Sequence, residues 1–252
     1  MKKYLEEARV ISNGAITVAI YKLTFESPQI ARSALPGQFV NVSVETAFLR
    51  RPFGIVEACG ETGEVTIIYR LVGTGTAAMT NLRAGDKVSV EGPLGEGTFS
   101  TAAGKVLLVG GGVGLAPLIY LAGRLDEKPV VLVGGKTKEE TFWREFFKDK
   151  AEKVYVTTDD GSAGIQGFAV AALPQIFSEN KIDRIAVCGP TVMMKTIAEK
   201  AEEAGISCEV SMEKRMACGI GVCLGCTFES KKDKKRYKVC SDGPVFDSKE
   251  VF

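Results

Sequence analysis

The chain contains no histidine among its 252 residues. Histidine is the side chain that most often acts as a general base near neutral pH, and it completes Ser-His-Asp triads. It also supplies two ligands of a Rieske cluster and many ligands of other metal ions. The sequence therefore excludes these classes of site, and it predicts that any redox chemistry depends on bound cofactors.

The chain also lacks an excess of charge of either sign. Its formal net charge is +1, with 25% charged and 45% hydrophobic residues, which is typical of an ordinary soluble globular protein. Nothing in this balance indicates binding to nucleic acid or to an anionic membrane, and we expect neither as a partner. The length allows more than one hydrophobic core.

A long hydrophobic run is missing as well. The most apolar stretch, residues 106–122, is shorter than the roughly 20 residues that a bilayer requires, and a glycine cluster and Pro117 interrupt it. It therefore predicts a strand, a loop and a helix. No apolar run follows the first charged residues, so we predict no signal peptide. Cys59, Cys188 and Cys208 lie beside small or apolar residues, as reduced buried thiols do, and we expect a cytoplasmic protein.

The other four cysteines form a motif. Cys218, Cys223 and Cys226 have the spacing C-x4-C-x2-C, and Cys240 follows later, which is the spacing of a plant-type [2Fe-2S] cluster. The loop contains glycines that permit left-handed backbone angles, namely Gly219, Gly221 and Gly225. We expect the polar stretch 229–236 to be a hairpin turn that returns the chain to Cys240. A structural zinc site is the alternative, although zinc motifs usually present two closely spaced cysteine pairs.

From about Leu5 to Phe99 the sequence predicts a small antiparallel barrel or sandwich. Short runs rich in Val, Ile, Thr and aromatic residues alternate with turns that contain Gly, Pro or Asn. We expect strands at residues 15–25, 38–44, 53–59, 65–72 and 87–91, with turns at 12–14, 36–37 and 60–63.

Two segments of this region carry residue types that bind anions. Arg50 and Arg51 precede an expected strand, where their guanidinium groups can hold a phosphate or a ring carbonyl. An exposed basic pair before an edge strand is the alternative. Farther along, Arg70 lies in the last part of the expected strand 65–72, and a glycine turn at 73–75 precedes a short helix at 77–82. Free amides at a helix start beside an arginine form an anion site, and a plain strand-to-helix turn is the alternative.

After Gly104 the pattern changes to alternating strands and helices, which predicts a doubly wound parallel sheet. We expect strands at residues 105–109, 130–133, 153–157, 184–188 and 207–211. We expect helices at 115–125, from Lys138, at 168–177 and at 190–204. Thr137 and Glu140 have the spacing of a capping box for the second of these helices.

A glycine loop, residues 110–114, follows the first of these strands, at the place where such sheets bind dinucleotides. Its register differs from the usual G-x-G-x-x-G, and tight packing of strand against helix without a ligand is the alternative. Cys188 and Pro190 lie at the carboxyl end of a later strand, where ligands of these sheets also bind. A merely structural cysteine is the alternative there.

Taken together, these motifs resemble those of the ferredoxin-NADP reductase superfamily. Within it, they are similar to the electron-transfer subunits of the heteromeric, NAD-dependent (type B) dihydroorotate dehydrogenases. The resemblance covers essentially the full chain and rests on residues 51–54, 69–76, 110–114, 188–190, 213–226 and 240–244.

The resemblance implies a multidomain fold of the β plus α/β class. Residues 1–99 would form an antiparallel β-barrel FAD domain, and residues 100–212 a doubly wound parallel-sheet NAD domain. Residues 213–252 would form a small C-terminal [2Fe-2S] module.

The resemblance also implies cofactor contacts. The flavin of FAD would contact Arg51, Pro52, Phe53 and Gly54, while its ribityl chain and diphosphate would be held by Ile68, Tyr69, Arg70, Gly75 and Thr76. The nicotinamide nucleotide would face Gly112, Gly114, Cys188 and Pro190, and the irons would be bound by Cys218, Cys223, Cys226 and Cys240. Relatives usually carry Ser or Thr in place of Gly54, so a side-chain hydrogen bond to flavin N5 must come from elsewhere or be absent.

By this resemblance the chain is an oxidoreductase subunit without catalytic residues of its own. NAD(H) would exchange a hydride with FAD, and FAD would pass single electrons to the [2Fe-2S] cluster, because flavin takes electrons in pairs or singly. The cluster would exchange electrons with FMN in a separate catalytic subunit that interconverts dihydroorotate and orotate. The resemblance implies a heterotetramer of the two subunits.

Other functions remain open at this point. The small subunit of another NAD(P)H-ferredoxin transhydrogenase or of a sulfide dehydrogenase would use the same modules. A zinc-stabilised binding module would be a function of a different class. The sequence does not decide between NAD and NADP. Lys136 and Lys138 lie where the 2′-phosphate of NADP would bind, but Glu139 and Glu140 follow directly and would repel it. The family leans to NAD.

Overall fold

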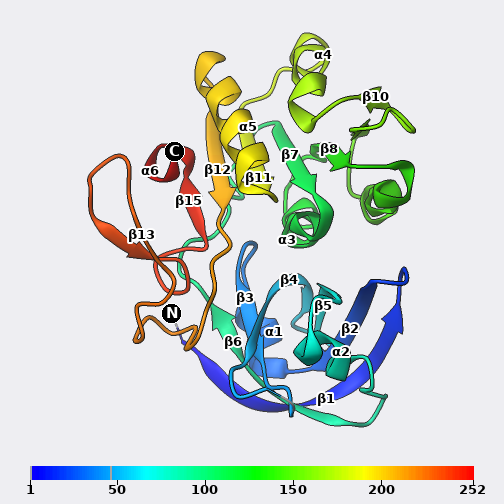
Figure 1. The fold of residues 1–252 in the computed structure, drawn as a ribbon, viewed down its shortest axis with the longest axis vertical. Coiled ribbons are helices and arrows are strands. Elements are labelled where there is room, and N and C mark those ends of the chain that lie inside the picture. Colours follow the sequence, from blue (N-terminus) through cyan, green and yellow to red (C-terminus); the bar gives the residue numbers. More distant parts are fainter. Residues whose placement is uncertain (1, 46) are drawn as a thin grey trace. The chain divides into compact units, whose positions relative to one another are not determined.

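The computed structural model describes residues 2–45 and 47–252 and divides the chain into two compact units (Figure 1). The first unit contains the residues up to Thr98 together with Glu213–Phe228 and Arg236–Pro244. The second contains Phe99–Met212, Glu229–Lys235 and Val245–Phe252. The segments that carry the four motif cysteines therefore belong to the first unit.

The first unit is built on a closed antiparallel barrel with the strand order β1-β2-β5-β4-β3-β6 (Figure 1). Its strands are β1 (Tyr4–Ala15), β2 (Ile20–Glu26), β3 (Phe39–Val42), β4 (Arg51–Cys59), β5 (Glu64–Arg70) and β6 (Lys87–Leu94). Two short helices connect them, α1 (Pro28–Ser33) and α2 (Thr74–Met79). The side chains that fill the barrel include Val10, Leu23, Phe25, Ile55 and Ile67, each 0% exposed. The predicted antiparallel barrel is confirmed.

The turn expected at residues 12–14 is wrong, because these residues lie within β1. The Asn13 carboxamide, whose residue type suggested a turn, instead forms hydrogen bonds with residues that are distant in the sequence. It donates to the Met79 carbonyl oxygen at 2.8 Å and accepts a hydrogen bond from the Tyr69 hydroxyl at 3.1 Å. Tertiary partners thus override the local turn preference of asparagine, and the chain reverses between β1 and β2.

The second unit contains a seven-stranded sheet with the order β10-β9-β8-β7-β11-β12-β15. Its strands are β7 (Val106–Gly111), β8 (Val130–Gly135), β9 (Lys153–Thr158), β10 (Ile165–Gln166), β11 (Arg184–Cys188), β12 (Ser207–Ser211) and β15 (Val245–Asp247). Its helical segments are η1 (Gly112–Gly114), α3 (Leu115–Ala122), η2 (Lys138–Phe147), η3 (Ala169–Ala172), α4 (Leu173–Glu179), α5 (Thr191–Glu203) and α6 (Ser248–Val251). All pairs are parallel except that of β15 with β12.

Helices cover both faces of this sheet. A Cβ atom built on Gly110 would lie 2.5 Å from Leu115 Cδ2 in α3, whereas one built on Gly111 would lie 3.2 Å from Met193 Sδ in α5. Because neighbouring residues of a strand point to opposite faces, α3 and α5 lie on opposite faces of the sheet. The predicted doubly wound sheet is confirmed.

The apolar stretch 106–122 forms β7, η1 and α3, as expected from its glycines. All residues of α3 are buried, which explains why this helix is hydrophobic on every side. Across the part of the chain that the structure describes, every helix is too short or too polar to cross a membrane.

The α-helix expected from Lys138 is instead a series of 3-10 turns, η2. The capping box between Thr137 and Glu140 does not form. The Thr137 hydroxyl donates to Glu139 Oε2 at 2.5 Å, and Glu140 Oε2 accepts from the Lys136 N–H at 2.9 Å. The two glutamates therefore hold the turn that precedes η2 and do not cap an α-helix.

The polar stretch after the third motif cysteine forms the expected hairpin. Strands β13 (Thr227–Glu229) and β14 (Arg236–Lys238) make a two-stranded sheet. In its turn the Ser230 N–H donates to the Lys235 carbonyl oxygen at 2.8 Å. This prediction is confirmed.

Candidate cofactor sites

The start of β4 carries the residues expected at the flavin. The ring of Phe53 lies 5.8 Å from that of Tyr69, which stacks on Tyr21 at 5.6 Å. Burial raises the pKa of Tyr69 to about 12, although the hydrogen bond to Asn13 opposes this, so the phenol stays protonated. Phe53 and Tyr21 are partly exposed and can offer aromatic surface to a planar ring, whereas Tyr69 is 0% exposed and only packs against them.

Arg51 and Gly75 lie in contact, although they are far apart in the sequence. A Cβ atom built on Gly75 would lie 3.0 Å from Arg51 Nε, so the glycine lets the guanidinium approach the first turn of α2. Arg70 is exposed at the end of β5. The Thr76 hydroxyl is used within its own turn, since it accepts from the Gly73 N–H at 3.3 Å and donates to the Gly73 carbonyl oxygen at 3.1 Å. The structure therefore offers two guanidinium groups, and not this hydroxyl, to a phosphate.

The remaining residues expected at the flavin differ in exposure. Pro52 and Gly54 are partly exposed in β4. Ile68 is only 2% exposed in β5, so its backbone and not its side chain could reach a cofactor outside the barrel.

The glycine loop of the second unit contains two different kinds of glycine. A Cβ atom built on Gly114 would lie 2.5 Å from the Cys188 carbonyl oxygen, so close packing requires this glycine. A Cβ atom built on Gly112 would meet nothing within 4 Å, and its φ is +58°. Gly112 thus borders open space and adopts a left-handed conformation that favours glycine. Packing explains Gly114, and room for a ligand remains at Gly112.

The segment around Cys188 meets this loop. Cys188 is paired in register with Gly110, and Pro190 Cδ would lie 3.5 Å from a Cβ atom on Gly111. The two segments therefore lie at the carboxyl ends of β7 and β11, where the strand order switches direction and such sheets bind ligands. Cys188 is buried, with 2% exposure.

Two aspartates at the end of β9 escaped the sequence analysis. The Asp159 N–H donates to the Gly135 carbonyl oxygen at 3.1 Å, and Asp160 Oδ1 accepts from the Ser162 hydroxyl at 2.6 Å. Ser162 Oγ accepts in turn from the Lys138 N–H at 2.8 Å. These bonds join the end of β9 to the turn after β8, which already contains two glutamates. Their position directly after a strand of a parallel sheet could have indicated these aspartates as site residues.

Two carboxylates of this region, Asp160 and Glu139, have lowered pKa values. Hydrogen bonds from the Ser162 hydroxyl and amide lower the pKa of Asp160, and the hydrogen bond from the Thr137 hydroxyl lowers that of Glu139. Near them Phe168 is 70% exposed, directly before η3. This edge of the sheet therefore presents negative charge and an exposed aromatic ring.

The four motif cysteines lie together in the first unit as two pairs. The Cys223 N–H donates to Cys218 Sγ at 3.4 Å, and the Cys240 N–H donates to Cys226 Sγ at 3.4 Å. Left-handed backbone angles turn the loop at Gly219, Gly221 and Leu224. The expectation that Gly225 would adopt such an angle is wrong, because the non-glycine residue before it does so.

A [2Fe-2S] cluster takes four thiolates, shared between two irons, and the four motif cysteines of the first unit match that number. Burial opposes ionisation of Cys218, but backbone amides of Cys223 and Ile220 outweigh it and lower the pKa of Cys218 to about 6. The loop thus already stabilises a thiolate.

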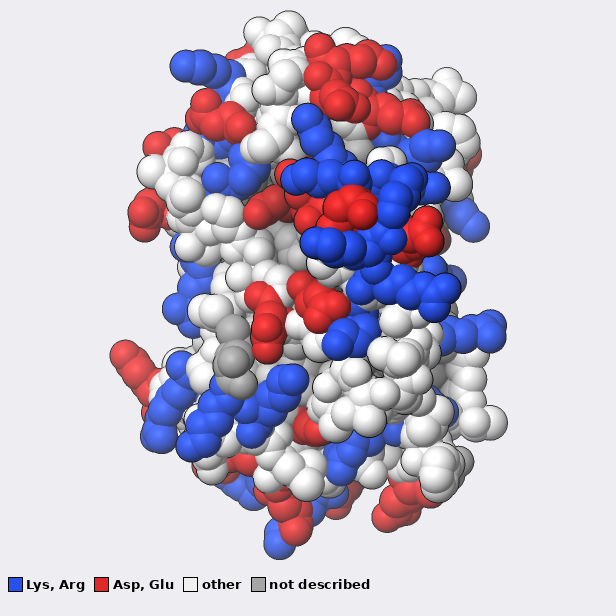
Figure 2. Space-filling view, turned by 90° about the vertical axis from the view of Figure 1, so that its left-hand side faces the viewer, with Lys and Arg blue, Asp and Glu red and all other residues white. Residues whose placement is uncertain are grey.

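The cluster loop exposes apolar side chains beside one cysteine. Cys223 is exposed, while Cys226 and Cys240 are buried. The apolar rim consists of Ile220, Val222 and Leu224, which are 39%, 75% and 61% exposed. On the face drawn in Figure 2, basic and acidic side chains lie among uncharged ones. The rim is therefore a candidate contact surface whose character is apolar.

Comparison with known proteins gives consistent matches. Residues 4–99 match the model of an oxidoreductase FAD-binding domain, and residues 213–252 match that of the iron-sulfur cluster binding domain of dihydroorotate dehydrogenase B. The dihydroorotate dehydrogenase B (NAD(+)) electron transfer subunit of Caldanaerobacter subterraneus subsp. tengcongensis is 39% identical over 97% of both chains. The subunit of the same name from Fusobacterium nucleatum is 37% identical over 98% of both chains.

A solved structure extends the comparison. A chain of the NADH-dependent reduced ferredoxin-NADP oxidoreductase, studied for flavin-based electron bifurcation, has 31% identity and a TM-score of 0.88. The match covers 98% of this chain and 90% of that one.

Proposed function

Since the chain belongs to the family of dihydroorotate dehydrogenase B (NAD(+)) electron transfer subunits, we propose that it transfers electrons between NAD(H) and a catalytic partner subunit. The route runs through FAD and a [2Fe-2S] cluster. The observation that carries this proposal is the placement of two cysteine pairs in the same unit as the flavin-type barrel.

The residues of this chain bind and position the cofactors. Bound FAD would supply the conversion of electron pairs from nicotinamide into the single electrons that an iron-sulfur cluster carries. Arg51 and Arg70 would neutralise the FAD diphosphate, and the ring of Phe53 would support the flavin ring. Gly112 leaves room for the nicotinamide nucleotide. We assign residues 1–99 to FAD, 100–212 to NAD and 213–252 to the cluster.

The orotate chemistry belongs to the partner subunit. Oxidation of dihydroorotate requires a base within hydrogen-bond reach of a C–H proton. This chain has no histidine, and none of its Cys, Ser or Lys residues outside the cofactor segments stands in a recognisable base motif. We propose that the partner contains FMN, that the two subunits form a heterotetramer, and that the complex is cytoplasmic. The apolar rim at Ile220, Val222 and Leu224 supports docking of the partner beside the cluster.

The nucleotide is NAD and not NADP in this proposal. The turn after β8 contains Glu139 and Glu140, and Asp159 and Asp160 follow β9. Two of these carboxylates have lowered pKa values and stay ionised. They repel the 2′-phosphate of NADP at short range. Lys136 and Lys138 lie in the same segment and would attract a 2′-phosphate, but the four carboxylates outnumber them.

A second candidate function has one observation in its favour. The similarity to a chain of the NADH-dependent reduced ferredoxin-NADP oxidoreductase covers nearly the full length. A subunit of that kind would use the same cofactors with a different partner. The higher identity to the dihydroorotate dehydrogenase B subunits favours the first proposal.

The test is purification of the chain alone and with the partner that it binds in its own cell. The isolated chain should contain FAD, iron and acid-labile sulfide, and should oxidise NADH with artificial acceptors but leave dihydroorotate untouched. The complex should convert dihydroorotate to orotate with NAD. Reduction of the isolated chain's flavin by dihydroorotate would contradict the division of labour, and ferredoxin-dependent activity of the complex would favour the second candidate.

A further inference from the structure

Strand β3 contains one polar residue where an apolar one would be expected. All of Phe39–Val42 is buried, and Asn41 is only 1% exposed between two valines that are fully buried. Removing a carboxamide from water is unfavourable unless both of its ends find hydrogen-bond partners. A valine or leucine at this position would avoid that cost.

The Asn41 side chain lies between the strand of the flavin motif and the cluster loop. In the antiparallel pair of β3 and β4 it stands opposite Pro52, so both side chains lie on the same face of the sheet. Its Nδ2 donates to the carbonyl oxygen of Cys218 at 3.4 Å. Pro52 belongs to the expected flavin contacts, and Cys218 is the first cysteine of the cluster motif.

The neighbouring glycine shows how closely the loop approaches this carboxamide. A Cβ atom built on Gly219 would lie 2.0 Å from Asn41 Nδ2 and 3.3 Å from Leu94 Cδ1. Gly219 also has a φ of +72°. A side chain at position 219 would displace the Asn41 carboxamide or the loop and would strain the backbone, so glycine at this position allows the close contact with Asn41.

The other end of the same carboxamide has no partner. Asn41 Oδ1 is buried and accepts no hydrogen bond from any residue that the structure describes. A buried acceptor without a donor lowers stability, and such groups in folded proteins call for an explanation. Folding alone does not supply one, because the strand would be more stable with an apolar side chain.

We propose that Asn41 is a positioning residue that fixes the cluster loop on the flavin-carrying strands and so sets the rate of electron transfer between FAD and the cluster. The inference rests on the proposed function, in which both cofactors are bound in this unit. In the transfer step, one electron leaves reduced FAD and reduces the oxidised cluster by one. Asn41 acts through its hydrogen bond to the Cys218 carbonyl oxygen.

The test uses the holoprotein with Asn41→Leu, which removes both polar ends, and Asn41→Asp, which keeps the shape but removes the donor. Thr24→Val is the matched control, because Thr24 Oγ1 and Thr66 Oγ1 form a buried hydrogen bond of 2.9 Å elsewhere in the barrel. Each protein is mixed with NADH without oxygen. Flavin bleaching, cluster reduction by absorbance and freeze-quench EPR, cofactor content and the urea midpoint of unfolding are measured.

In both Asn41 variants, flavin reduction by NADH should keep its rate while cluster reduction slows several-fold, because the rate of electron tunnelling falls steeply as the distance between the carriers grows. Asn41→Leu should keep or raise the urea midpoint, whereas Thr24→Val should lower it without slowing cluster reduction. Wild-type rates of cluster reduction in both Asn41 variants would overturn the inference. Loss of iron from both would overturn it too, because the residue would then only retain the cluster. Absence of FAD or iron from the wild-type protein would instead overturn the proposed function.

Discussion

Gly112 and Gly114 occupy one loop but are glycines for different physical reasons. Gly114→Ala places a methyl group 2.5 Å from a backbone oxygen and should destabilise the second unit by about 3 kcal/mol, the upper end for overpacking. Gly112→Ala meets open space and should cost about 1 kcal/mol from its left-handed backbone. Urea unfolding of the two variants checks this order.

The Gly112→Ala variant also tests whether the nicotinamide nucleotide binds at this loop. Gly112→Ala should raise the KM for NADH, because the methyl group enters the space left for the nucleotide. An unchanged KM in a folded Gly112→Ala protein would contradict the placement of NAD at this loop.

Arg70 tests the flavin site. Its guanidinium is exposed at the end of β5, so Arg70→Ala removes a charged partner of the FAD diphosphate without disturbing the core. The affinity for FAD should fall by about 1.5 to 3 kcal/mol, the range for a charged hydrogen bond. Flavin content after dialysis measures this. Arg83→Ala, which removes an exposed arginine from the loop after α2, is the control and should retain FAD.

Cys223 tests the cluster. Cys223→Ser should lose or destabilise the cluster while FAD stays bound, because the barrel residues hold the flavin. Iron and acid-labile sulfide analysis, together with visible absorbance, provides the measurement. Full iron and sulfide in this variant would show that Cys223 is not a ligand.

Single residues also show where sequence reasoning reaches its limit. The cysteine spacing predicted the loop, and the structure brings Cys218, Cys223, Cys226 and Cys240 together as two pairs. The backbone angles were only partly predictable, since Leu224 and not Gly225 turns left-handed. A leucine there is strained for its type, so the fold of the whole loop decides it.

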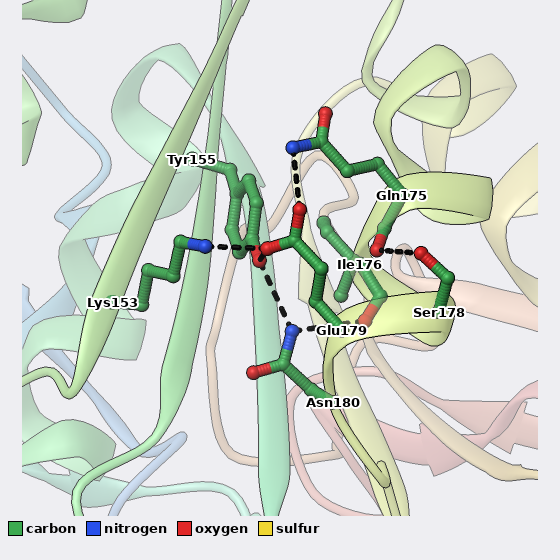
Figure 3. Close-up of polar contacts among 7 residues, drawn as sticks. All are labelled: Lys153, Tyr155, Gln175, Ile176, Ser178, Glu179 and Asn180. Atoms are coloured by element: carbon green, nitrogen blue, oxygen red, sulfur yellow. Dashed lines mark hydrogen bonds and ion pairs between the residues drawn. The ribbon is translucent and has the colours of Figure 1, made fainter.

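At the scale of elements, a polar cluster joins β9 to α4 (Figure 3). Glu179 accepts hydrogen bonds from Lys153, from the Tyr155 hydroxyl at 2.5 Å and from Gln175 Nε2 at 2.7 Å. The Asn180 Nδ2 donates to the Tyr155 hydroxyl oxygen at 3.1 Å and to the Ile176 carbonyl oxygen at 2.9 Å. The Lys153 ammonium is the largest cause that lowers the pKa of Glu179, to about 2.

This cluster predicts an acid-dependent stability. Because the pKa of Glu179 is depressed from 4.5 to about 2, its contribution is fully present above pH 4.5 and is lost as the pH falls towards 2. Glu179→Gln should therefore lower the Tm at pH 6, and the difference from wild type should shrink below pH 4.5. Glu145→Gln, on an exposed part of η2, is the control for removal of one negative charge.

Elements were predictable where the local pattern agreed with the tertiary environment. The parallel strands of the second unit have continuous apolar runs, and their positions follow from the sequence. The turn expected at 12–14 failed because Asn13 has partners far away in the chain. The helix expected from Lys138 failed because Glu139 and Glu140 bind the preceding turn. Neither kind of long-range or competing contact is visible in a local pattern.

At the scale of the whole molecule, the apolar rim predicts where the partner binds. Val222→Asp should abolish or strongly weaken association with the catalytic subunit, because a charge would be buried in an apolar contact. NADH oxidation with artificial acceptors should be unchanged. Val18→Asp, at a residue that is 96% exposed between β1 and β2, is the control and should associate normally. Normal association of the Val222→Asp protein would remove the rim as the docking surface.

The grouping of segments into units was beyond the sequence. The stretches Glu213–Phe228 and Arg236–Pro244 belong with the barrel, although the parallel-sheet residues precede them in the chain. Contacts such as that of a Cβ on Gly95, 2.6 Å from the Gly243 carbonyl oxygen, produce this grouping. These contacts join residues that are distant in the sequence, so no local sequence pattern predicts them.

The two edge strands of the seven-stranded sheet limit aggregation by addition of strands from other chains. Its outer strands are β10 with two residues and β15 with three, and β15 runs antiparallel to its neighbour. Long, flat outer strands with unpaired amides are templates on which other chains polymerise into aggregates. The barrel is closed and has no outer strand. Short outer strands on one sheet and closure of the barrel thus leave little unpaired backbone on which a fibril could grow.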